Sequence, residues 1–246
     1  MQGKVILVTG GAKRVGAAIC RRLHAAGANL VIHYRSSIYE ALALRASLEQ
    51  LRQGSAICVQ ADLLDQAALK KMVGDAVQHF GRLDALVNNA SSFYATPLAA
   101  INERQWDDLL GTNLKAPLFL AQAAADELKR CNGAIVNIAD IHAERPMHGH
   151  ILYSAAKAGL VALTKGLAQE LAPDVRVNAV APGVIIWPES DDWQDEAQRN
   201  RIVAHTLLKR EGEPDDIART VKFLLEDAPY ITGQVIAVDG GRSINL

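Results

Sequence analysis

Short apolar runs rich in β-branched residues alternate with amphipathic stretches along the whole chain. The runs predict strands at 4–9, 29–34, 56–60, 83–88, 133–138, 175–180 and 234–239. Helices are predicted at about 14–26, 38–53, 65–79, 102–130, 150–171 and 214–226. Strands that alternate with helices are typical of parallel sheets, and strands without polar alternation are usually covered on both faces. The sequence therefore predicts an α/β fold: a doubly wound parallel β-sheet flanked by helices on both faces.

The domain organisation follows from length and pattern. The chain has 246 residues, about the length of one large or two small domains. It contains no internal repeat, low-complexity tract or linker, so we predict a single domain over 1–246. The largest irregular stretch, about 183–197, contains Trp187 and Trp193. We expect a segment of about 183–206 to form a lid over the substrate.

The composition argues against several classes of protein. There are 26 basic and 27 acidic residues, and aromatic residues make up 5% of the chain. A polybasic nucleic-acid binder and a stacking platform for single strands are therefore not expected. Three scattered cysteines without a Cys-x-x-Cys pair favour neither a disulfide framework nor a cysteine zinc site, and they suit a reducing compartment. No apolar run approaches the roughly 20 residues of a membrane helix, so we expect a cytoplasmic protein with no membrane or nucleic-acid partner.

A glycine-containing loop, Thr9-Gly-Gly-Ala-Lys-Arg-Val-Gly16, lies between the first predicted strand and the first predicted helix. Glycines let the backbone approach a pyrophosphate, and a helix N-terminus offers free amides and a positive dipole. The loop differs from the common Gly-x-Gly-x-x-Gly pattern, because Gly10 and Gly16 bracket Arg14. An ordinary tight turn between a strand and a helix is the alternative.

The end of the second predicted strand indicates which dinucleotide would bind. NAD enzymes usually place Asp or Glu here to accept hydrogen bonds from ribose hydroxyls. This chain instead has His33, Tyr34, Arg35, Ser36 and Ser37. An arginine pairs bidentately with a phosphate, so we predict NADPH rather than NADH. The alternative is that Arg35 is a solvated surface charge.

Tyr153 and Lys157 are four residues apart in a predicted helix and therefore share one face. A cation about 4 Å from a phenol contributes about 4 kcal/mol at an effective dielectric of about 20. That interaction would lower the pKa of the phenol from about 10 towards about 7, where it exchanges protons usefully with a substrate. A surface pair with no chemistry is the alternative, because Tyr-x-x-x-Lys spacings also occur by chance.

These residues belong to a longer series of motifs. In chain order the series is Thr9, Gly10, Gly16, Asp62, Asn88, Asn89, Ala90, Asn113, Tyr153, Lys157, Pro182, Gly183 and the terminal 238–241. In this order and spacing the chain resembles the short-chain dehydrogenase/reductase family over essentially its whole length. The resemblance implies a Rossmann-type domain, usually in a homotetramer, that transfers a hydride from a nicotinamide cofactor.

The resemblance also implies roles for individual residues. Asp62 would lie near the adenine and Asn89 near the adenosine ribose. Asn113 would hold a proton-relay water together with Lys157, which would also bind the nicotinamide ribose. The implied cofactor-binding residues are Gly10, Arg14, Val15, Gly16, His33, Tyr34, Arg35, Ser36, Ala61, Asp62, Leu63, Asn89, Ala90, Ser91, Tyr153, Lys157, Pro182 and Gly183. Family members often hold the carboxamide with a threonine shortly after Pro-Gly, and the residues 184–186 that follow here contain none.

Two positions depart from the general family pattern. Most members have glycine where Arg14 stands, and serine where Asp140 stands, thirteen residues before Tyr153. That serine donates a hydrogen bond to a substrate carbonyl, whereas an ionised aspartate only accepts. Asp140 therefore argues against a simple ketone and favours a heterocycle with N–H groups and imine nitrogens. Its charge should also offset part of the effect of Lys157 and keep Tyr153 protonated. A structural cap in a protein that has lost its chemistry is the alternative.

Both departures, with the 89–94 sequence Asn-Ala-Ser-Ser-Phe-Tyr, resemble the pteridine reductase branch of the family. Its members reduce dihydropterins, and often dihydrofolate, with NADPH; hydride would reach C6 of the pterin and a proton N5. The implied catalytic residues are Asp140, Tyr153, Lys157 and Asn113. The implied substrate-binding residues are Arg14, Ser91, Phe93, Asp140, Tyr153 and Trp187. Phe93 would stack on the pterin, although a core aromatic after a strand is the alternative.

Other functions stay open from the sequence. One is a carbonyl reductase of the same family that acts on 3-oxoacyl thioesters or sugars, against which Asp140 and Phe93 argue. Another is a non-catalytic NADP-binding sensor, against which Asn113, Tyr153 and Lys157 argue. Histidines at 142, 148 and 150 lack the carboxylate or cysteine spacing of a metal site, so no metal is predicted.

Overall fold

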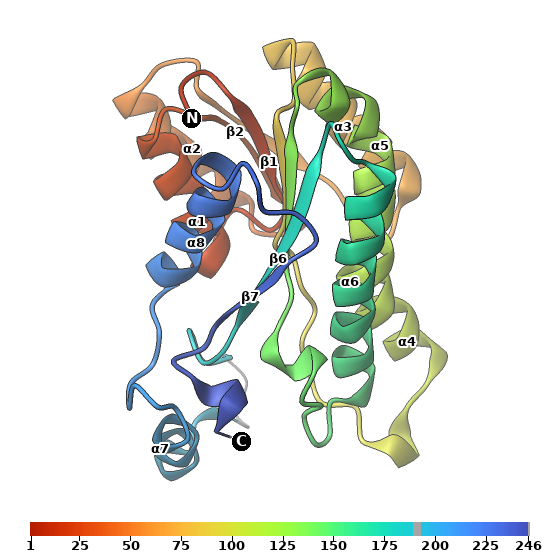
Figure 1. The fold of residues 1–246 in the computed structure, drawn as a ribbon, viewed down its shortest axis with the longest axis vertical. Helices are drawn as coiled ribbons and strands as arrows, with labels where there is room; N and C mark the ends of the chain where they lie inside the picture. The colour runs from red at the N-terminus through yellow and green to blue at the C-terminus, as the bar shows by residue number, and fades with distance from the viewer. Residues whose placement is uncertain (189–192, 246) are drawn as a thin grey trace.

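Seven parallel strands form one sheet in the computed structural model, which describes residues 1–188 and 193–245 (Figure 1). The strands are β1 (Val5–Val8), β2 (Asn29–Tyr34), β3 (Ala56–Gln60), β4 (Ala85–Asn88), β5 (Ala134–Ile138), β6 (Arg176–Pro182) and β7 (Val235–Val238). Their order across the sheet is β3-β2-β1-β4-β5-β6-β7. The predicted doubly wound parallel sheet is confirmed.

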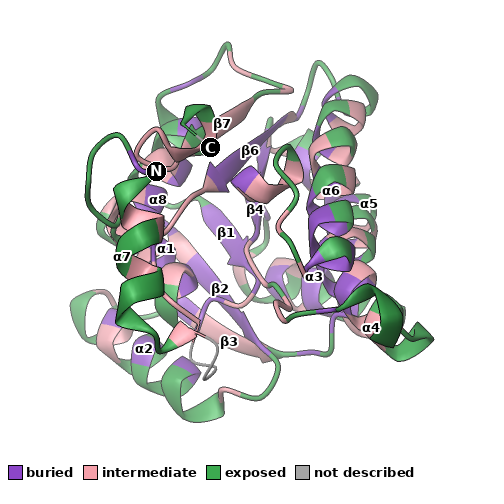
Figure 2. Cartoon of the chain, turned by 90° about the horizontal axis from the view of Figure 1, so that it is seen from below, coloured by how far each residue is buried: buried purple, intermediate pink, exposed green. Residues whose placement is uncertain are grey.

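Helices cover both faces of the sheet. They are α1 (Arg14–Ala25), α2 (Ile38–Leu51), α3 (Gln66–Phe80), α4 (Glu103–Leu110), α5 (Ala116–Arg130), α6 (Ile151–Glu170), α7 (Glu196–Ala204) and α8 (Pro214–Glu226). Helices α1, α2 and α8 lie on one side, and α3, α5 and α6 on the other (Figures 1 and 2). The inner strands of the sheet are largely buried, as the purple ribbons of Figure 2 show, whereas the edge strands β3 and β7 are mostly half-buried.

Strand β1 shows why both layers form. Ile6 and Val8 pack with α1 and α8, whereas Val5 and Leu7 pack with α3 and α5. Successive side chains of a strand point to opposite faces, so an apolar residue at every position requires cover on both sides. Each such side chain contributes about 1.5–3 kcal/mol when fully buried.

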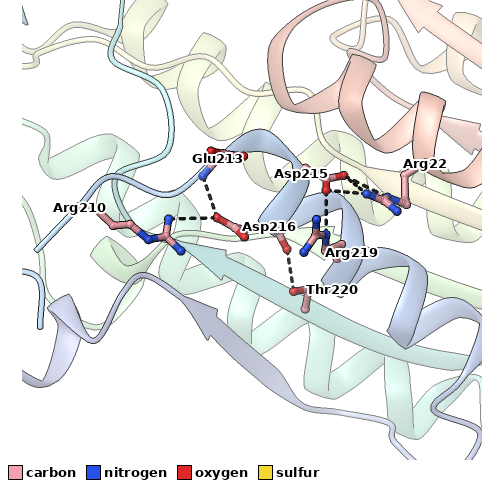
Figure 3. Close-up of polar contacts among 7 residues, drawn as sticks. All are labelled: Arg22, Arg210, Glu213, Asp215, Asp216, Arg219 and Thr220. Atoms are coloured by element: carbon pink, nitrogen blue, oxygen red, sulfur yellow. Dashed lines mark hydrogen bonds and ion pairs between the residues drawn. The ribbon is translucent and has the colours of Figure 1, made fainter. Parts of the chain in front are cut away.

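The contact between α1 and α8 is held by charge as well as by apolar packing. Arg22 of α1 donates to Asp215 of α8 with an Nε–Oδ1 distance of 3.0 Å, and Arg219 reaches the same carboxylate at 2.7 Å (Figure 3). Asp216 accepts from the backbone N–H of Glu213 at 2.8 Å. The acidic first turn of α8 therefore both caps this helix and ties it to α1.

Two expectations about helices were wrong. The predicted single helix over 102–130 is divided by a π-helical turn, η2 (Gly111–Lys115), between α4 and α5. Within this turn the Asn113 side chain donates to the carbonyl oxygens of Ser92 and Leu109, each at 2.9 Å. Helix α7 lies within the predicted lid segment of about 183–206, where no helix was predicted. Residues 189–192 of that segment lie outside the described residues.

The strand order places a crevice at the carboxyl edge of the sheet. The chain runs outward from β1 through β2 to β3 and then returns to place β4 on the other side of β1. Ligands of open α/β sheets bind outside the carboxyl ends of the strands at such a reversal.

Candidate active site

A cavity of about 690 Å³ lies at this reversal. Its walls come from the segments that follow all seven strands, together with Tyr153 and Lys157 of α6. It is large enough for a drug-sized or cofactor-sized molecule. Segments far apart in the sequence thus meet at the carboxyl edge, as the motif order predicts.

The loop after β1 brings its backbone close to the cavity. Gly10 has a φ of 59°, which favours glycine. A Cβ on Gly16 would come within 2.1 Å of the Gly10 carbonyl oxygen, so only glycine fits there. The Asn89 side chain donates to the carbonyls of Thr9 and Gly10 at 2.9 and 3.1 Å. Asn89, predicted near the adenosine ribose, therefore fixes the shape of this loop.

Arg14 occupies a backbone conformation that glycine usually takes. Its φ is 53°, in the left-handed region that non-glycine residues rarely adopt, which explains glycine as the common residue at this position of the family pattern. Its side chain donates to the carbonyl oxygens of Ile186 and Trp187 at 3.2 and 2.9 Å. Arg14 therefore connects the loop after β1 with the segment after β6.

His33 joins three strands beneath this loop. Its Nδ1 accepts from the N–H of Gly10 at 3.0 Å, and its Nε2 lies 3.1 Å from the carbonyl oxygen of Ala61. The ring is only 2% exposed, and burial lowers its pKa. The imidazole is therefore neutral, with its proton on Nε2.

Acidification should weaken the fold through His33. Below the ordinary histidine pKa of about 6.5 the unfolded chain binds the proton that the buried ring refuses, so the free energy of unfolding falls as pH decreases from there. His33→Ala should cost about 1–3 kcal/mol at pH 7.5, because Gly10 and Ala61 lose their partner, and should flatten this pH dependence. Urea unfolding at pH 7.5 and 5.5 measures both effects. The exposed His205→Ala serves as control; an unchanged pH dependence in His33→Ala would contradict the assignment.

Positive charge gathers where β2 ends. Arg35, Ser36 and Ser37 line the cavity, and Lys13 lines it from the neighbouring loop. The nearest acid of the sequence, Glu40, forms an ion pair with Lys13 at 3.5 Å. This end of the cavity therefore suits an anion.

Tyr153 and Asp140 form a hydrogen-bonded pair on the cavity wall. The Tyr153 hydroxyl donates to Oδ2 of Asp140 at 2.7 Å, and the other carboxylate oxygen accepts from the backbone N–H of His142 at 2.8 Å. The second bond caps the short helix η3 (Ile141–Ala143). Asp140 is thus a structural cap and a partner of the phenol at the same time.

Burial and charge keep Tyr153 protonated. Burial and then the charge of Asp140 raise the pKa of Tyr153 well above its ordinary value, while Ser91 acts in the opposite direction. The expected lowering by Lys157 does not prevail, since its Nζ donates to the carbonyl of Ile138 at 2.8 Å and lies 5.6 Å from the phenol ring centroid. Burial lowers the pKa of Lys157 to about 8. The phenol is therefore a proton donor at neutral pH.

Asn113 is connected to Tyr153 through Ser91. It is 1% exposed, and its side-chain oxygen accepts from the Ser91 hydroxyl at 2.6 Å. Ser91 itself lines the cavity. The π-helical turn therefore orients Asn113 towards a cavity residue, and Asn113 is not itself on the cavity surface.

Aromatic side chains form one end of the cavity. The Phe93 ring stacks on His150 and meets Tyr153 edge-on, with ring centroids 4.8 Å apart in both pairs. Trp187 stacks on Trp193 at 5.8 Å, and both line the cavity. Flat aromatic faces of this kind favour a planar ring as ligand.

Most of the predicted site residues meet in this one cavity. All of them line it except Asn113 and Ala61, whose carbonyl serves His33. Sequence reasoning missed further lining residues: Lys13, Ser92, Thr112, Met147 and Arg242. No motif assigns a role to these residues. Ser92 and Lys13 could have been identified only from their position in loops at the carboxyl edge of the sheet.

The part of the chain that the structure describes holds neither a cluster of metal ligands nor a membrane-spanning helix. Within residues 1–188 and 193–245, no group of three or more His, Cys, Asp or Glu side chains is arranged to hold a metal ion. Among the helices of the same ranges, none is both long and apolar enough to cross a bilayer.

Fold and site together define a dinucleotide-dependent oxidoreductase class with a Tyr–Lys pair on one helix. A family model described as enoyl-(acyl carrier protein) reductase matches residues 10–243. The chain belongs to the short-chain dehydrogenase/reductase family.

Named relatives point to more than one substrate class. The chain is 38% identical to the 3-oxoacyl-acyl-carrier-protein reductase FabG of Staphylococcus aureus, over 97% of each chain. It is 36% identical to pteridine reductase 1 of Leishmania tarentolae, over 98% of this chain and 96% of the other. A solved structure, a blue fluorescent protein from a metagenomic library in complex with NADPH, matches with a TM-score of 0.90, 38% identity and 98% coverage of both chains. This relative agrees with the prediction of a nicotinamide cofactor.

Proposed function

We propose that the protein is an NADPH-dependent reductase of 7,8-dihydropterins, including dihydrofolate. The observation that carries the proposal is the 2.7 Å hydrogen bond from Tyr153 to Asp140 on the cavity wall. A serine at position 140 would donate to a ketone oxygen, whereas this carboxylate only accepts. Ring N–H groups are the complementary donors.

The end of the cavity formed by the loops after β1 and β2 fits NADPH. Gly16 keeps the backbone open at the N-terminus of α1, where free amides favour a pyrophosphate. Arg35, Ser36 and Ser37 supply donors for a 2′-phosphate. When bound, the cofactor supplies the hydride.

Removal of the Arg35 charge should change cofactor preference. Arg35→Ala should raise the KM for NADPH by about 10- to 100-fold, the effect of losing a charge-assisted hydrogen bond, and should leave the KM for NADH almost unchanged. Initial rates with both cofactors measure the change, and Arg45→Ala, exposed on α2, is the control. Equal loss with both cofactors would mean that Arg35 does not read the phosphate.

Tyr153 and Asp140 would have different roles in the reaction. Tyr153 carries a proton at neutral pH, because burial and Asp140 raise its pKa, and would donate it to N5 of the ring directly or through water. Asp140 would accept from ring N–H groups. Lys157, held by the Ile138 carbonyl, would orient the nicotinamide ribose, and Asn113 would orient Ser91 and a relay water.

The aromatic end would bind the pterin ring. Phe93 meets Tyr153 edge-on and so fixes where a planar ring can stack. Arg14, Ser91 and Trp187 line the same part of the cavity. A lid of about 183–206 over this ring stays a prediction.

A 3-oxoacyl reductase is the second candidate. Relatives with that name, such as the Staphylococcus aureus protein at 38% identity, favour it. A difference of two percentage points from the pteridine reductase relative does not separate substrates. The group at position 140 separates them better, because a carboxylate beside the phenol repels the alkoxide that forms from a ketone.

The proposal is tested by the oxidation of NADPH with a panel of substrates. The panel holds dihydrobiopterin, dihydromonapterin, dihydrofolate and an acetoacetyl thioester, followed by NADPH absorbance. We expect turnover of the dihydropterins and little of the thioester. The reverse preference would establish the 3-oxoacyl reductase, and micromolar binding of NADPH without any turnover would indicate a sensor.

The proposal includes a cytoplasmic homotetramer. Trp106, Leu118 and Ile151 leave 51%, 40% and 50% of their surface exposed on α4, α5 and α6, which would suit burial between subunits. Sedimentation equilibrium tests the stoichiometry.

A further inference from the structure

The C-terminal turn after β7 carries an arginine that the reaction above does not use. This turn, η5 (Arg242–Ile244), follows Gly240 and Gly241, which have φ values of 63° and 78°. The Asp239 carboxylate accepts from the backbone N–H groups of Gly241 and Ser243 at 2.9 and 2.7 Å. Although burial alone would raise it, these hydrogen bonds lower the pKa of Asp239. The turn is therefore fixed, and Arg242 has a defined position.

The Arg242 side chain lines the same cavity as Asp140 and Tyr153. Its Nε is buried and has no hydrogen-bond partner within residues 1–188 and 193–245. Burial lowers the pKa of its guanidinium, and the charges of Asp140 and Asp239 act in the opposite direction. A guanidinium stays charged in proteins, and a buried donor without a partner is destabilising. This arrangement indicates that a ligand supplies a hydrogen-bond acceptor to Arg242.

The other cations and acids near this end have partners. Lys157 donates to the Ile138 carbonyl, and Arg14 donates to the carbonyls of Ile186 and Trp187. Asp140 accepts from Tyr153 and His142. Arg242 therefore remains available to a substrate group.

We propose that Arg242 is a specificity-determining residue that binds a carboxylate on the substituent of the substrate ring. The planar ring would stack on Phe93 with its N–H edge at the Tyr153–Asp140 pair, and its substituent would extend towards the C-terminal turn. A guanidinium binds a carboxylate through two parallel hydrogen bonds. The proposal rests on the proposed function. It predicts that the protein prefers, among dihydropterins, those with an anionic substituent, such as dihydrofolate.

The test compares Arg242→Met with the wild type on dihydrofolate and on the uncharged dihydrobiopterin. We expect the kcat/KM for dihydrofolate to fall by about 10- to 100-fold, as for a lost charge-assisted hydrogen bond, and the kcat/KM for dihydrobiopterin to stay within about threefold. Arg242→Lys keeps the charge and loses the planar fork, so its kcat/KM for dihydrofolate should lie between those of the wild type and Arg242→Met. Arg45→Met removes an exposed cation of α2 as control. Equal loss on both substrates, or loss on neither, would overturn the proposal.

Binding measurements and a second pair of substrates distinguish a failure of this proposal from a failure of the proposed function. Quenching of Trp187 and Trp193 fluorescence by folate should weaken in Arg242→Met, and quenching by uncharged pterin should not. If the wild type reduces thioesters instead of dihydropterins, the proposed function fails. The comparison then uses acetoacetyl-coenzyme A, which is anionic, and the uncharged acetoacetyl-N-acetylcysteamine. A loss confined to the anionic thioester supports an anion-binding Arg242, and a uniform result refutes it.

Discussion

Tyr153→Phe should lower the kcat for dihydropterin reduction by about 10²- to 10⁴-fold, the usual contribution of a positioned proton donor. The phenol is 5% exposed and held by Asp140 at 2.7 Å, and its raised pKa keeps the proton on the oxygen at neutral pH. Phenylalanine retains the ring that packs edge-on against Phe93. The variant therefore removes the proton and little of the packing.

Binding measurements show whether the loss is chemical. The dissociation constant of NADPH should stay within a few-fold of the wild type, because Arg35, Gly16 and Lys157 are untouched. Thermal unfolding should also change little. Turnover near the wild-type rate would remove Tyr153 from the reaction.

Asp140→Ser should reverse the preference between nitrogen rings and ketones. We expect the kcat/KM for dihydrobiopterin to fall by at least about 10²-fold, as for a lost acid–base partner, and that for an acetoacetyl thioester to rise. The serine hydroxyl donates to a carbonyl oxygen, which the carboxylate cannot do. The ratio of the two kcat/KM values is the measurement.

The pH profile gives a second reading of the same substitution. The charge of Asp140 raises the pKa of Tyr153, so its removal should move the alkaline fall of the rate to lower pH. Asp140→Asn, similar in shape and uncharged, should shift the profile in the same direction. An Asp140→Ser enzyme with full dihydropterin activity would show that position 140 only caps η3.

Much of the fold could be predicted because the strands are marked by local sequence. Runs such as Val5–Val8 have apolar side chains at every position, and both helix layers follow from covering them. The break between α4 and α5 could not be predicted, since it depends on contacts of Asn113 with Ser92 and Leu109. Only the folded chain brings Ser92, 21 residues away, to that turn.

Site residues could be predicted where their relation depends on spacing along the sequence. They could not be predicted where it depends on distances in the folded chain. Tyr153 and Lys157 share a helix face because of their spacing, but the assumed separation of about 4 Å ignored the Ile138 carbonyl that binds Lys157. Asp140 was identifiable as a partner of Tyr153 from the motif. Arg242 was not, because nothing local in 238–241 indicates that the next side chain enters the cavity.

The most direct test of the account is a crystal structure of the protein with NADPH and folate. We predict that the pterin ring stacks on Phe93 against the nicotinamide, with its N–H edge at the carboxylate of Asp140 and N5 within reach of Tyr153. A carboxylate turned away from the nicotinamide, or folate bound outside the cavity, would contradict the assignment of this pocket to a nitrogen heterocycle.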